Sequence, residues 1–475
     1  MTPEEFRRAG HQLIDWIADY RGSIETRAVR ARVEPGDIRG SFASVPPESP
    51  AGPGQLLREL EEKIVPGITQ VQHPMHYGWF PSNASLASTL GDIASSGLGT
   101  LGISWESCPA LTELEEVVCD WLRQLTGLSA DWRGCIQDTA STSCLTVLLA
   151  ARERASDFSQ NRGGLQGESM PLVVYTTAEA HSSVAKAALL AGFGEDNLRQ
   201  VETDPQTRGM DPAALAAAVE ADLAAGRRPA AVVATSGTTG VVAFDPIDGI
   251  AAVARRHKIW LHVDAAMAGS AMLLPECREL WHGADEADSI AWNPHKWMGT
   301  ILDCSLLYLR DVEHLVRVMS TNPSYLRSTA DGEVTQFRDW GIPLGRRFRA
   351  LKLWYHLGID GIDAIRARLR RDLDNARWFA AEVEAADDWR VLAPVRLQTV
   401  CIRHQPAGLD GEALDRHTLA WVERINRSGE AFMSPSQLDG RWMVRVSIGV
   451  EATERAHLEK LWALLRETAD EVADG

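Results

Sequence analysis

The chain has 475 residues and a formal net charge of −17 at pH 7. Apolar residues make up 45% and charged residues 24%, which is typical of a soluble globular protein. Nucleic acids and anionic membrane surfaces select basic faces, so neither is expected as a partner of this acidic chain. The length exceeds that of one ordinary domain and favours two or three.

Seven cysteines are scattered along the chain without a Cys-x-x-Cys pair. This pattern favours reduced thiols over a disulfide framework or a zinc site, so no metal is expected. The first residues lack the basic and apolar regions of a signal peptide. The longest Ala/Leu-rich stretch, residues 213–225, contains Glu220 and Asp222 and is too short and too charged to span a bilayer. We therefore expect a cytoplasmic protein.

The order of the predicted elements indicates an α/β fold. Thr2 and Pro3 start an N-terminal helix, and the turn-rich segment 34–53 is interpreted as an arm and linker. From about residue 85, short apolar runs alternate with helical stretches, which is typical of βα units around a mostly parallel sheet. The clearest apolar runs are 172–175, 231–234 and 259–263, and helical stretches include 111–125 and 246–256.

The pattern changes after residue 347. A long amphipathic helix is expected from about residue 350 to Val383, and its Arg-rich stretch 366–371 is interpreted as a solvated face. Strands at 397–403 and 443–448 and a last helix from Thr453 complete the chain. We predict three parts: an N-terminal helical arm (1–84), a large domain (85–350) and a small α+β C-terminal domain (351–475).

Two residues are the first candidates for chemistry. Lys296 lies among apolar and aromatic neighbours in Asn293-Pro294-His295-Lys296-Trp297. Desolvation lowers the pKa of a lysine and makes it a competent Schiff-base amine, although a lone lysine is more often a solvated charge. Asp264 ends the apolar run 259–263 at the edge where open α/β sheets bind ligands. Its carboxylate suits a metal, a base or a heterocyclic cation, or it caps the next helix.

Three further segments belong to the same predicted edge. Residues 139–143, Thr-Ala-Ser-Thr-Ser, open a helix and suit either a phosphate or an ordinary N-cap. His181 follows the run 172–175 and is either functional or a hydrogen-bonded structural histidine. The Gly- and hydroxyl-rich loop 236–240 follows the run 231–234. A lysine, a carboxylate, an imidazole and a phosphate cradle on one crevice are the set that pyridoxal 5′-phosphate (PLP) requires.

Several motifs carry a resemblance to a known family. The chain resembles the group II PLP-dependent decarboxylases, within them the aromatic-L-amino-acid decarboxylase branch, and it looks most like bacterial L-DOPA decarboxylases. The resemblance runs nearly end to end. It implies PLP-dependent transferase fold type I, similar to aspartate aminotransferase, with a mostly parallel seven-stranded sheet in the large PLP-binding domain. The most specific motifs are Ser104-Trp105, Pro109-Ala110-Leu111-Thr112-Glu113-Leu114-Glu115, His181-Ser182-Ser183-Val184, His262-Val263-Asp264, residues 293–297 and Pro343-Leu344-Gly345-Arg346-Arg347-Phe348-Arg349.

The resemblance also implies roles for individual residues. Lys296 would form the Schiff base with PLP, Asp264 would pair with the pyridine nitrogen, and His181 would stack on the ring. Tyr325 matches the catalytic-loop tyrosine of the family, which works as a homodimer with the active site at the interface. The residues implied to hold the phosphate or approach the cofactor are Thr139, Ala140, Ser141, Asn293, His295 and Thr239.

The implied reaction is decarboxylation of an aromatic L-amino acid to its amine. By this resemblance Lys296 would hold PLP until the substrate amine replaces it, and Asp264 would keep the pyridine nitrogen protonated so that the cofactor could accept the electrons of the bond to the carboxylate. After CO2 leaves, Tyr325 returns a proton to Cα, or His181 assists. Relatives with phenylalanine at the position of Tyr325 tend to make aldehydes, so tyrosine there favours the amine.

The substrate pocket departs from that of the relatives. Val71 replaces a tryptophan, Trp79 beside Phe80 replaces the usual tyrosine, and Ile103 stands where animal enzymes have phenylalanine. Gly345 matches aromatic and indole decarboxylases rather than histidine decarboxylases. Such differences in shape are worth only about 1–3 kcal/mol each, so DOPA, tyrosine, phenylalanine and tryptophan all stay open.

Other functions remain alternatives. An aldehyde synthase would use the same substrates, and a decarboxylase of a non-aromatic L-amino acid would use a reshaped pocket. Tyr325 argues against the aldehyde synthase, and the group II motifs argue against an aminotransferase. A PLP-binding regulator or scaffold would not need a full catalytic set, and no DNA-binding segment or basic arm accompanies the chain.

Overall fold

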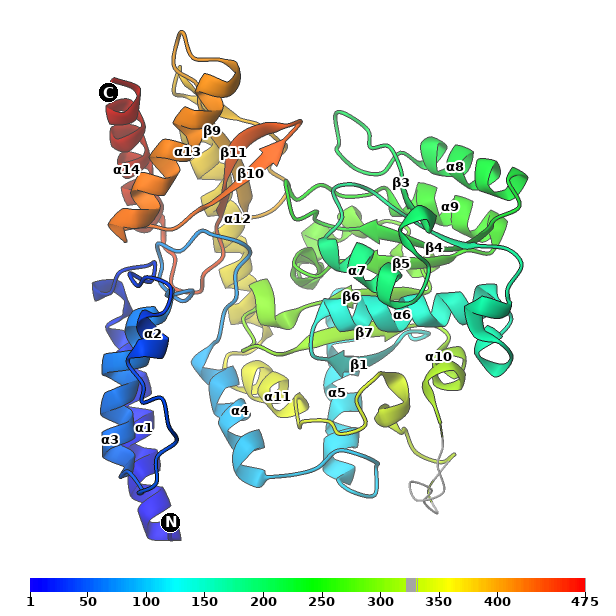
Figure 1. The fold of residues 1–475 in the computed structure, drawn as a ribbon, viewed down its shortest axis with the longest axis horizontal. Coiled ribbons are helices and arrows are strands. Elements are labelled where there is room, and N and C mark those ends of the chain that lie inside the picture. Colours follow the sequence, from blue (N-terminus) through cyan, green and yellow to red (C-terminus); the bar gives the residue numbers. More distant parts are fainter. Residues whose placement is uncertain (322–329, 331, 475) are drawn as a thin grey trace. The chain divides into compact units, whose positions relative to one another are not determined.

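The chain forms two compact units in a computed structural model that describes residues 1–321, 330 and 332–474 (Figure 1). The larger unit comprises Ser82–Leu373 and Pro394–Thr399. The smaller unit comprises Met1–Pro81, Asp374–Ala393 and Val400–Gly475. The division into three parts at residues 84 and 350 stays a prediction.

The larger unit is built on a seven-stranded sheet in the order β1-β7-β6-β5-β4-β2-β3. β7 runs antiparallel to β1 and β6, and the other neighbours pair in parallel. The prediction of a mostly parallel sheet is therefore confirmed. The strands are β1 (Arg133–Gln137), β2 (Leu172–Thr176), β3 (Leu198–Gln200), β4 (Arg228–Thr235), β5 (Trp260–Asp264), β6 (Ser289–Trp292) and β7 (Ser305–Leu309).

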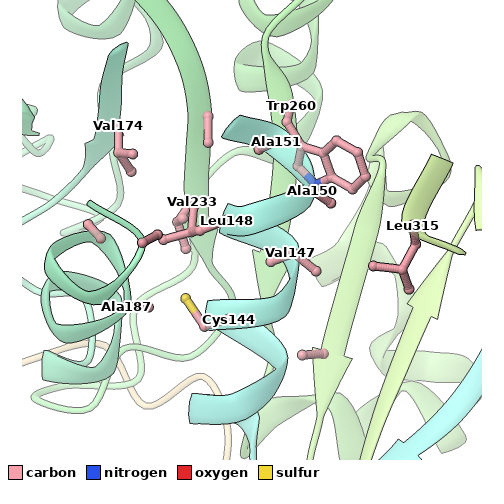
Figure 2. Packing of buried hydrophobic residues seen from close by; sticks show 14 of the residues in the cluster. Cys144, Val147, Leu148, Ala150, Ala151, Val174, Ala187, Val233, Trp260 and Leu315 are labelled. Atoms are coloured by element: carbon pink, nitrogen blue, oxygen red, sulfur yellow. The ribbon is translucent and has the colours of Figure 1, made fainter. Parts of the chain in front are cut away.

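Helix α6 (Ala140–Ala155) packs along this sheet and carries much of its core (Figure 2). Val147 and Leu148 of α6 lie in one buried cluster with Val233 of β4 and Trp260 of β5. Because α6 begins at Ala140 shortly after β1 ends at Gln137, the N-terminus of α6 lies at the carboxyl end of β1. The other helices of the unit are α4 (Leu86–Leu98), α5 (Pro109–Thr126), α7 (Ser182–Leu190), α8 (Pro212–Ala224), α9 (Ile247–His257), α10 (Val312–Met319), α11 (Ala350–Ile359) and the first half of α12 (Ile362–Glu384).

The prediction of one long helix from residue 350 to Val383 is wrong. Helix α11 ends at Ile359 and α12 begins at Ile362. Gly361 lies between them with a φ of 74°, in the left-handed region that glycine adopts at little cost. An amphipathic pattern continues across this glycine, so the break is invisible to periodicity alone.

The smaller unit has a four-stranded sheet in the order β10-β11-β9-β8. The expected strands at 397–403 and 443–448 correspond to β9 and β11. Thr2 and Glu5 form a capping box at the start of α1, as the expected helix start requires. The elements are α1 (Pro3–Gly22), α2 (Asp37–Gly40), α3 (Pro53–Glu59), β8 (Trp389–Val391), β9 (Thr399–His404), α13 (Gly411–Ser428), β10 (Ser434–Leu438), β11 (Arg441–Ser447) and α14 (Arg455–Asp474). Among the described residues, no helix has the length and apolarity that a membrane span needs.

A buried ion pair ties α5 to β1 in the larger unit. Arg346 donates to the two carboxylate oxygens of Glu115 at 3.0 and 2.6 Å and to the carbonyl of Ile136 at 2.7 Å. The backbone N–H of Ile136 donates to the same carboxylate at 2.8 Å. The exposed fractions of the two side chains are 8% for Arg346 and 1% for Glu115, so water cannot replace either partner.

Replacing Arg346 with methionine is expected to lower the free energy of unfolding by about 3–5 kcal/mol, because it leaves the Glu115 carboxylate buried without a cation. Chemical denaturation of the full chain measures this loss. The control is Arg370→Met, which removes an exposed pair with Glu276 and should change little. Equal losses in both variants would contradict the expectation.

Candidate active site

The candidate residues lie on segments that leave one edge of the larger sheet. The carboxyl ends of the parallel strands meet at this edge, where open α/β sheets bind ligands (Figure 1). The backbone N–H of Ser236 donates to the carbonyl of Asp264 at 2.8 Å, so the loop after β4 adjoins the end of β5. At this edge β2 leads to His181, β4 to the loop 236–240, and β6 to Lys296, and β5 ends at Asp264.

Lys296 and Asp264 both lie within electrostatic reach of His181. Partial burial lowers the pKa of His181, the Lys296 ammonium lowers it further, and the Asp264 carboxylate opposes both. Asp264 is only 6% exposed, and its Oδ1 accepts the backbone N–H of Ala266 at 3.0 Å. The structure thus brings together the amine, the carboxylate and the imidazole that the sequence singled out.

The ring of His181 is oriented by the helix that it precedes. His181 is the N-cap of α7, and its Nδ1 accepts the backbone N–H of Ser183 at 3.2 Å. The hydroxyl of Ser183 lies 2.7 Å from the same nitrogen. This leaves Nε2 and the ring face, which is solvent-exposed in the single chain, available to a ligand. The structural interpretation of His181 is therefore correct, and its functional role stays a prediction.

Lys296 occupies a short helical turn, Pro294–Met298, directly after β6. Its backbone N–H donates to the carbonyl of Asn293 at 2.9 Å, and its side chain is half-buried among buried neighbours. His295 is buried, and its Nδ1 accepts the backbone N–H of Cys304 at 2.9 Å. Burial and the Lys296 ammonium lower the pKa of His295 to about 4, so the ring is neutral and carries its proton on Nε2. It can donate a hydrogen bond there without adding charge.

A buried clamp from α12 holds the Lys296 turn, and the sequence interpretation missed it. The indole N–H of Trp297 donates to the carboxylate of Asp372 at 2.9 Å. The guanidinium of Arg368 donates to the carbonyls of Trp297 and Met298 at 2.8 and 2.5 Å. Asp372 is fully buried, and burial raises its pKa to about 6, against the opposing charge of Arg368. The interpretation of residues 366–371 as a solvated face is therefore wrong for Arg368, which is 11% exposed.

The N-terminus of α6 provides the candidate phosphate cradle. Thr139 is its N-cap, and the Thr139 hydroxyl accepts the backbone N–H of Thr142 at 3.4 Å. Ala140 and Ser141 are the first residues of the helix, whose terminal N–H groups and positive dipole end attract anions. Thr239 lies half-buried in the loop 236–240 after β4.

The chemistry of this edge fits PLP. Buried polar atoms here have no hydrogen-bond partner within the described residues: Thr177 Oγ1, Thr235 Oγ1, Ser236 Oγ and Asn293 Oδ1. Buried polar groups without partners are rare in native proteins and call for a missing ligand or water. With an amine, a buried carboxylate, an exposed imidazole and a helix N-terminus beside them, the donor set suits a phosphorylated pyridine aldehyde.

The predicted pocket residues of the smaller unit are partly accessible. Trp79 is 53% exposed and has a φ of 54°, which is rare for a bulky residue. The backbone N–H of Trp79 donates to the hydroxyl of Ser434 at 2.7 Å. The ring centroid of Trp79 lies 5.0 Å from that of Phe432. Arg445 lies over the ring of Phe80 at 4.9 Å, and Val71 is half-buried.

The predicted pocket residues of the larger unit lie on adjacent segments. Gly102 and Arg346 form an isolated antiparallel bridge. In this register the next residue of one segment, Ile103, lies opposite the preceding residue of the other, Gly345. A Cβ at Gly345 would meet only Leu101 Cδ1, at 3.9 Å, so sterics within this chain do not require glycine there. Ile103 and Gly345 belong to the larger unit, whereas Val71, Trp79 and Phe80 belong to the smaller unit. Tyr325 lies outside the described residues.

Comparison with known proteins identifies the family. The family model for the pyridoxal-dependent decarboxylase conserved domain matches residues 35–405. The chain is 37% identical to phenylacetaldehyde synthase of Arabidopsis thaliana and 35% identical to tyrosine decarboxylase of Papaver somniferum, over 99% of this chain and 96% of each relative. The crystal structure of Oryza sativa TDC with PLP and tryptamine matches with a TM-score of 0.96 and 36% identity over 99% of both chains.

Fold and edge chemistry together define a PLP-dependent enzyme of fold type I, as the sequence predicted. The chain belongs to the pyridoxal-dependent decarboxylase family, and its activity is that of a carboxy-lyase. The roles of the individual site residues stay predictions.

Replacing Asp372 with alanine is expected to weaken PLP retention by about tenfold, because it removes the buried acceptor of Trp297 Nε1 and the carboxylate that pairs with Arg368 at 3.7 Å; this corresponds to roughly 1–2 kcal/mol. The visible absorbance of bound PLP after dialysis measures retention, with circular dichroism to show that the variant is folded. Asp363→Ala is the control, since Asp363 lies on the same helix and is 99% exposed. Unchanged retention in a folded Asp372→Ala variant would refute the clamp.

Proposed function

We propose that the chain decarboxylates an aromatic L-amino acid to the corresponding amine and CO2. The observation that carries the proposal is the grouping of His181, Asp264 and Lys296 at one sheet edge in a chain of this family. The relatives support the substrate class. Their names specify tyrosine and phenylacetaldehyde, and the Oryza sativa structure contains tryptamine, which are all aromatic compounds.

The proposed roles follow from the positions of the side chains. Lys296 would hold PLP through Nζ, Asp264 would keep the pyridine nitrogen protonated, and the exposed ring of His181 would stack on the cofactor. The N-terminus of α6 at Thr139, Ala140 and Ser141 would bind the phosphate. Asn293 and His295, which follow β6, would help to hold it, and Thr239, which follows β4, would approach the cofactor. When bound, PLP supplies an electron sink for the bond to the leaving carboxylate.

The proton that replaces the carboxylate needs a donor. Tyr325 is the proposed donor to Cα on the basis of the family resemblance. His181 is the proposed assistant, because its Nδ1 is an acceptor for Ser183 and its proton therefore lies on Nε2. Val71, Trp79, Phe80, Ile103 and Gly345 are the proposed determinants of which ring is accepted.

Amine formation from a panel of L-amino acids tests the proposal. The panel contains DOPA, tyrosine, phenylalanine, tryptophan, histidine and glutamate, and products are identified by mass. Wild type should form amine from at least one aromatic substrate, and Lys296→Ala should form none and lose the visible absorbance of bound PLP. Trp79→Tyr should change the relative kcat/KM among the aromatic substrates by about 5- to 150-fold, because one pocket contact is worth about 1–3 kcal/mol.

Amine formed only from histidine or glutamate would refute the assignment of an aromatic substrate, but it would agree with the assignment of a decarboxylase. No amine from any member, from protein that carries PLP, would refute both.

An aldehyde synthase is the second candidate, since a relative with that name is 37% identical to this chain. Tyr325 favours the amine, and Tyr325→Phe is expected to raise the ratio of aldehyde to amine at least tenfold. Aldehyde, amine and hydrogen peroxide are measured together under air. If the wild type produces mainly aldehyde, the aldehyde synthase is the correct assignment. If the ratio of aldehyde to amine is the same in Tyr325→Phe and in the wild type, Tyr325 does not determine which product forms.

We further propose a cytoplasmic homodimer with its active site at the interface. Leu86, Leu90 and Ile93 form one exposed apolar stripe on α4, and a partner chain would cover such a stripe. All cysteines of the chain are free thiols, which suits a reducing compartment. Light scattering of the purified protein in solution tests the oligomeric state.

A further inference from the structure

The smaller unit contains a second group of ligating side chains, and none of them belongs to the candidate active site. Asp388 directly precedes β8, His404 ends β9, and Asp470 lies on α14. The Nε2 of His404 lies 2.8 Å from Asp388 Oδ2 and 3.7 Å from Asp470 Oδ1. The three ligand atoms lie within 4.8 Å of one another. Segments far apart in the sequence therefore direct one nitrogen and two oxygens at a common point.

The imidazole of His404 is held from behind by a second histidine. His404 is 1% exposed, and its Nδ1 lies 2.8 Å from Nε2 of His417 on α13. A histidine that binds a metal through Nε2 carries its proton on Nδ1 and usually donates it to a neighbouring acceptor. His417 is placed to be that acceptor. The arrangement of His404 and His417 is therefore the one that an outer ligand shell gives to a metal-binding histidine.

The two carboxylates face solvent, and no lysine or arginine among the described residues neutralises their charge. Asp388 is 43% and Asp470 is 64% exposed, so a cation can enter without opening the fold. In the part of the chain that the structure describes, His404 is their ion-pair partner, and neither pairs with Lys or Arg. A divalent cation bound to two carboxylates and a neutral imidazole would leave the group without net charge. A protonated His404 would neutralise only half of it.

We propose that Asp388, His404 and Asp470 form a binding site for a divalent transition-metal ion such as Zn²⁺. One imidazole and two carboxylates suit Zn²⁺ and its neighbours, whereas Mg²⁺ and Ca²⁺ select oxygen ligands alone. Ligand atoms of a tetrahedral zinc site with bonds of about 2.0–2.1 Å lie about 3.3 Å apart. The distances of 2.8 and 3.7 Å from Nε2 to the two oxygens bracket this value. The fourth position is open to water.

Bound metal would join β9, the segment before β8 and α14 within one unit. Trp389 lies next to the site, with its ring centroid 4.9 Å from that of His404. Trp389 also contacts the rings of Trp421 and Trp462. A quenching ion such as Cu²⁺ at His404 would therefore lower the tryptophan fluorescence of the protein, which gives a signal independent of catalysis.

Calorimetric titration of the full-length, PLP-loaded protein with Zn²⁺ tests the proposal. Wild type should bind one Zn²⁺ per chain at this site, and Asp470→Asn and His404→Gln should each weaken binding at least tenfold. His417→Ala should weaken it by about 10- to 100-fold through the outer shell. Asp387→Asn, which changes the exposed neighbour of Asp388, should leave the affinity unchanged. Cu²⁺ quenching should follow the same order.

Asp470 is exposed, so Asp470→Asn should fold even if substitution of the buried His404 does not. Equal Zn²⁺ affinity in wild type, Asp470→Asn and Asp387→Asn would overturn the proposal, and so would the absence of binding in wild type. None of these measurements uses turnover, so their outcome is independent of whether the proposed decarboxylation is correct.

Discussion

The parallel pairing of β4, β5 and β6 is the constraint on which the candidate site depends. The carboxyl ends of parallel neighbours lie at one edge of the sheet, so the loop 236–240, Asp264 and the Lys296 turn lie there together. Their proximity follows from the strand directions and does not require attraction between the polar side chains. Helix α6 adds the candidate phosphate cradle to the same edge because its apolar side is packed along the sheet. Hydrophobic burial thus positions polar groups that could not assemble by attraction to one another, since water would compete for each of them.

The Lys296 turn shows how such an edge is kept rigid. A lysine presented on an open loop would be mobile, but the carbonyls that follow it are bound by Arg368, and the neighbouring indole is bound by Asp372. Burying these charges is unfavourable in isolation, and each ion is tolerated because the other lies beside it. Burying Arg368 and Asp372 therefore fixes the conformation of the backbone around Lys296 rather than adding to the stability of the fold.

The sequence predicted the sheet and the order of its candidate residues well, because β2, β4 and β5 are continuous apolar runs that end in polar residues. The sequence-based predictions were wrong where a single residue determines the local structure. Gly361 interrupts a helix pattern that otherwise continues, and Arg368 has the same charge and spacing as its solvated neighbours. Asp372 lies between the inward-facing Leu369 and Leu373, and this position of a carboxylate was the one signal for the clamp. Charge patterning cannot tell an arginine in water from one that binds carbonyls.

Trp79 combines an unfavourable backbone conformation with a proposed role in substrate recognition. The left-handed backbone at this position costs a non-glycine residue about 1–2 kcal/mol, and glycine or asparagine would avoid most of that cost. Selection for thermostability alone would therefore favour replacement of Trp79, and any role of its indole ring in choosing a substrate would be lost. The same position is a natural starting point for altering substrate range, since a substitution there that weakens recognition can be offset by a gain in folding free energy.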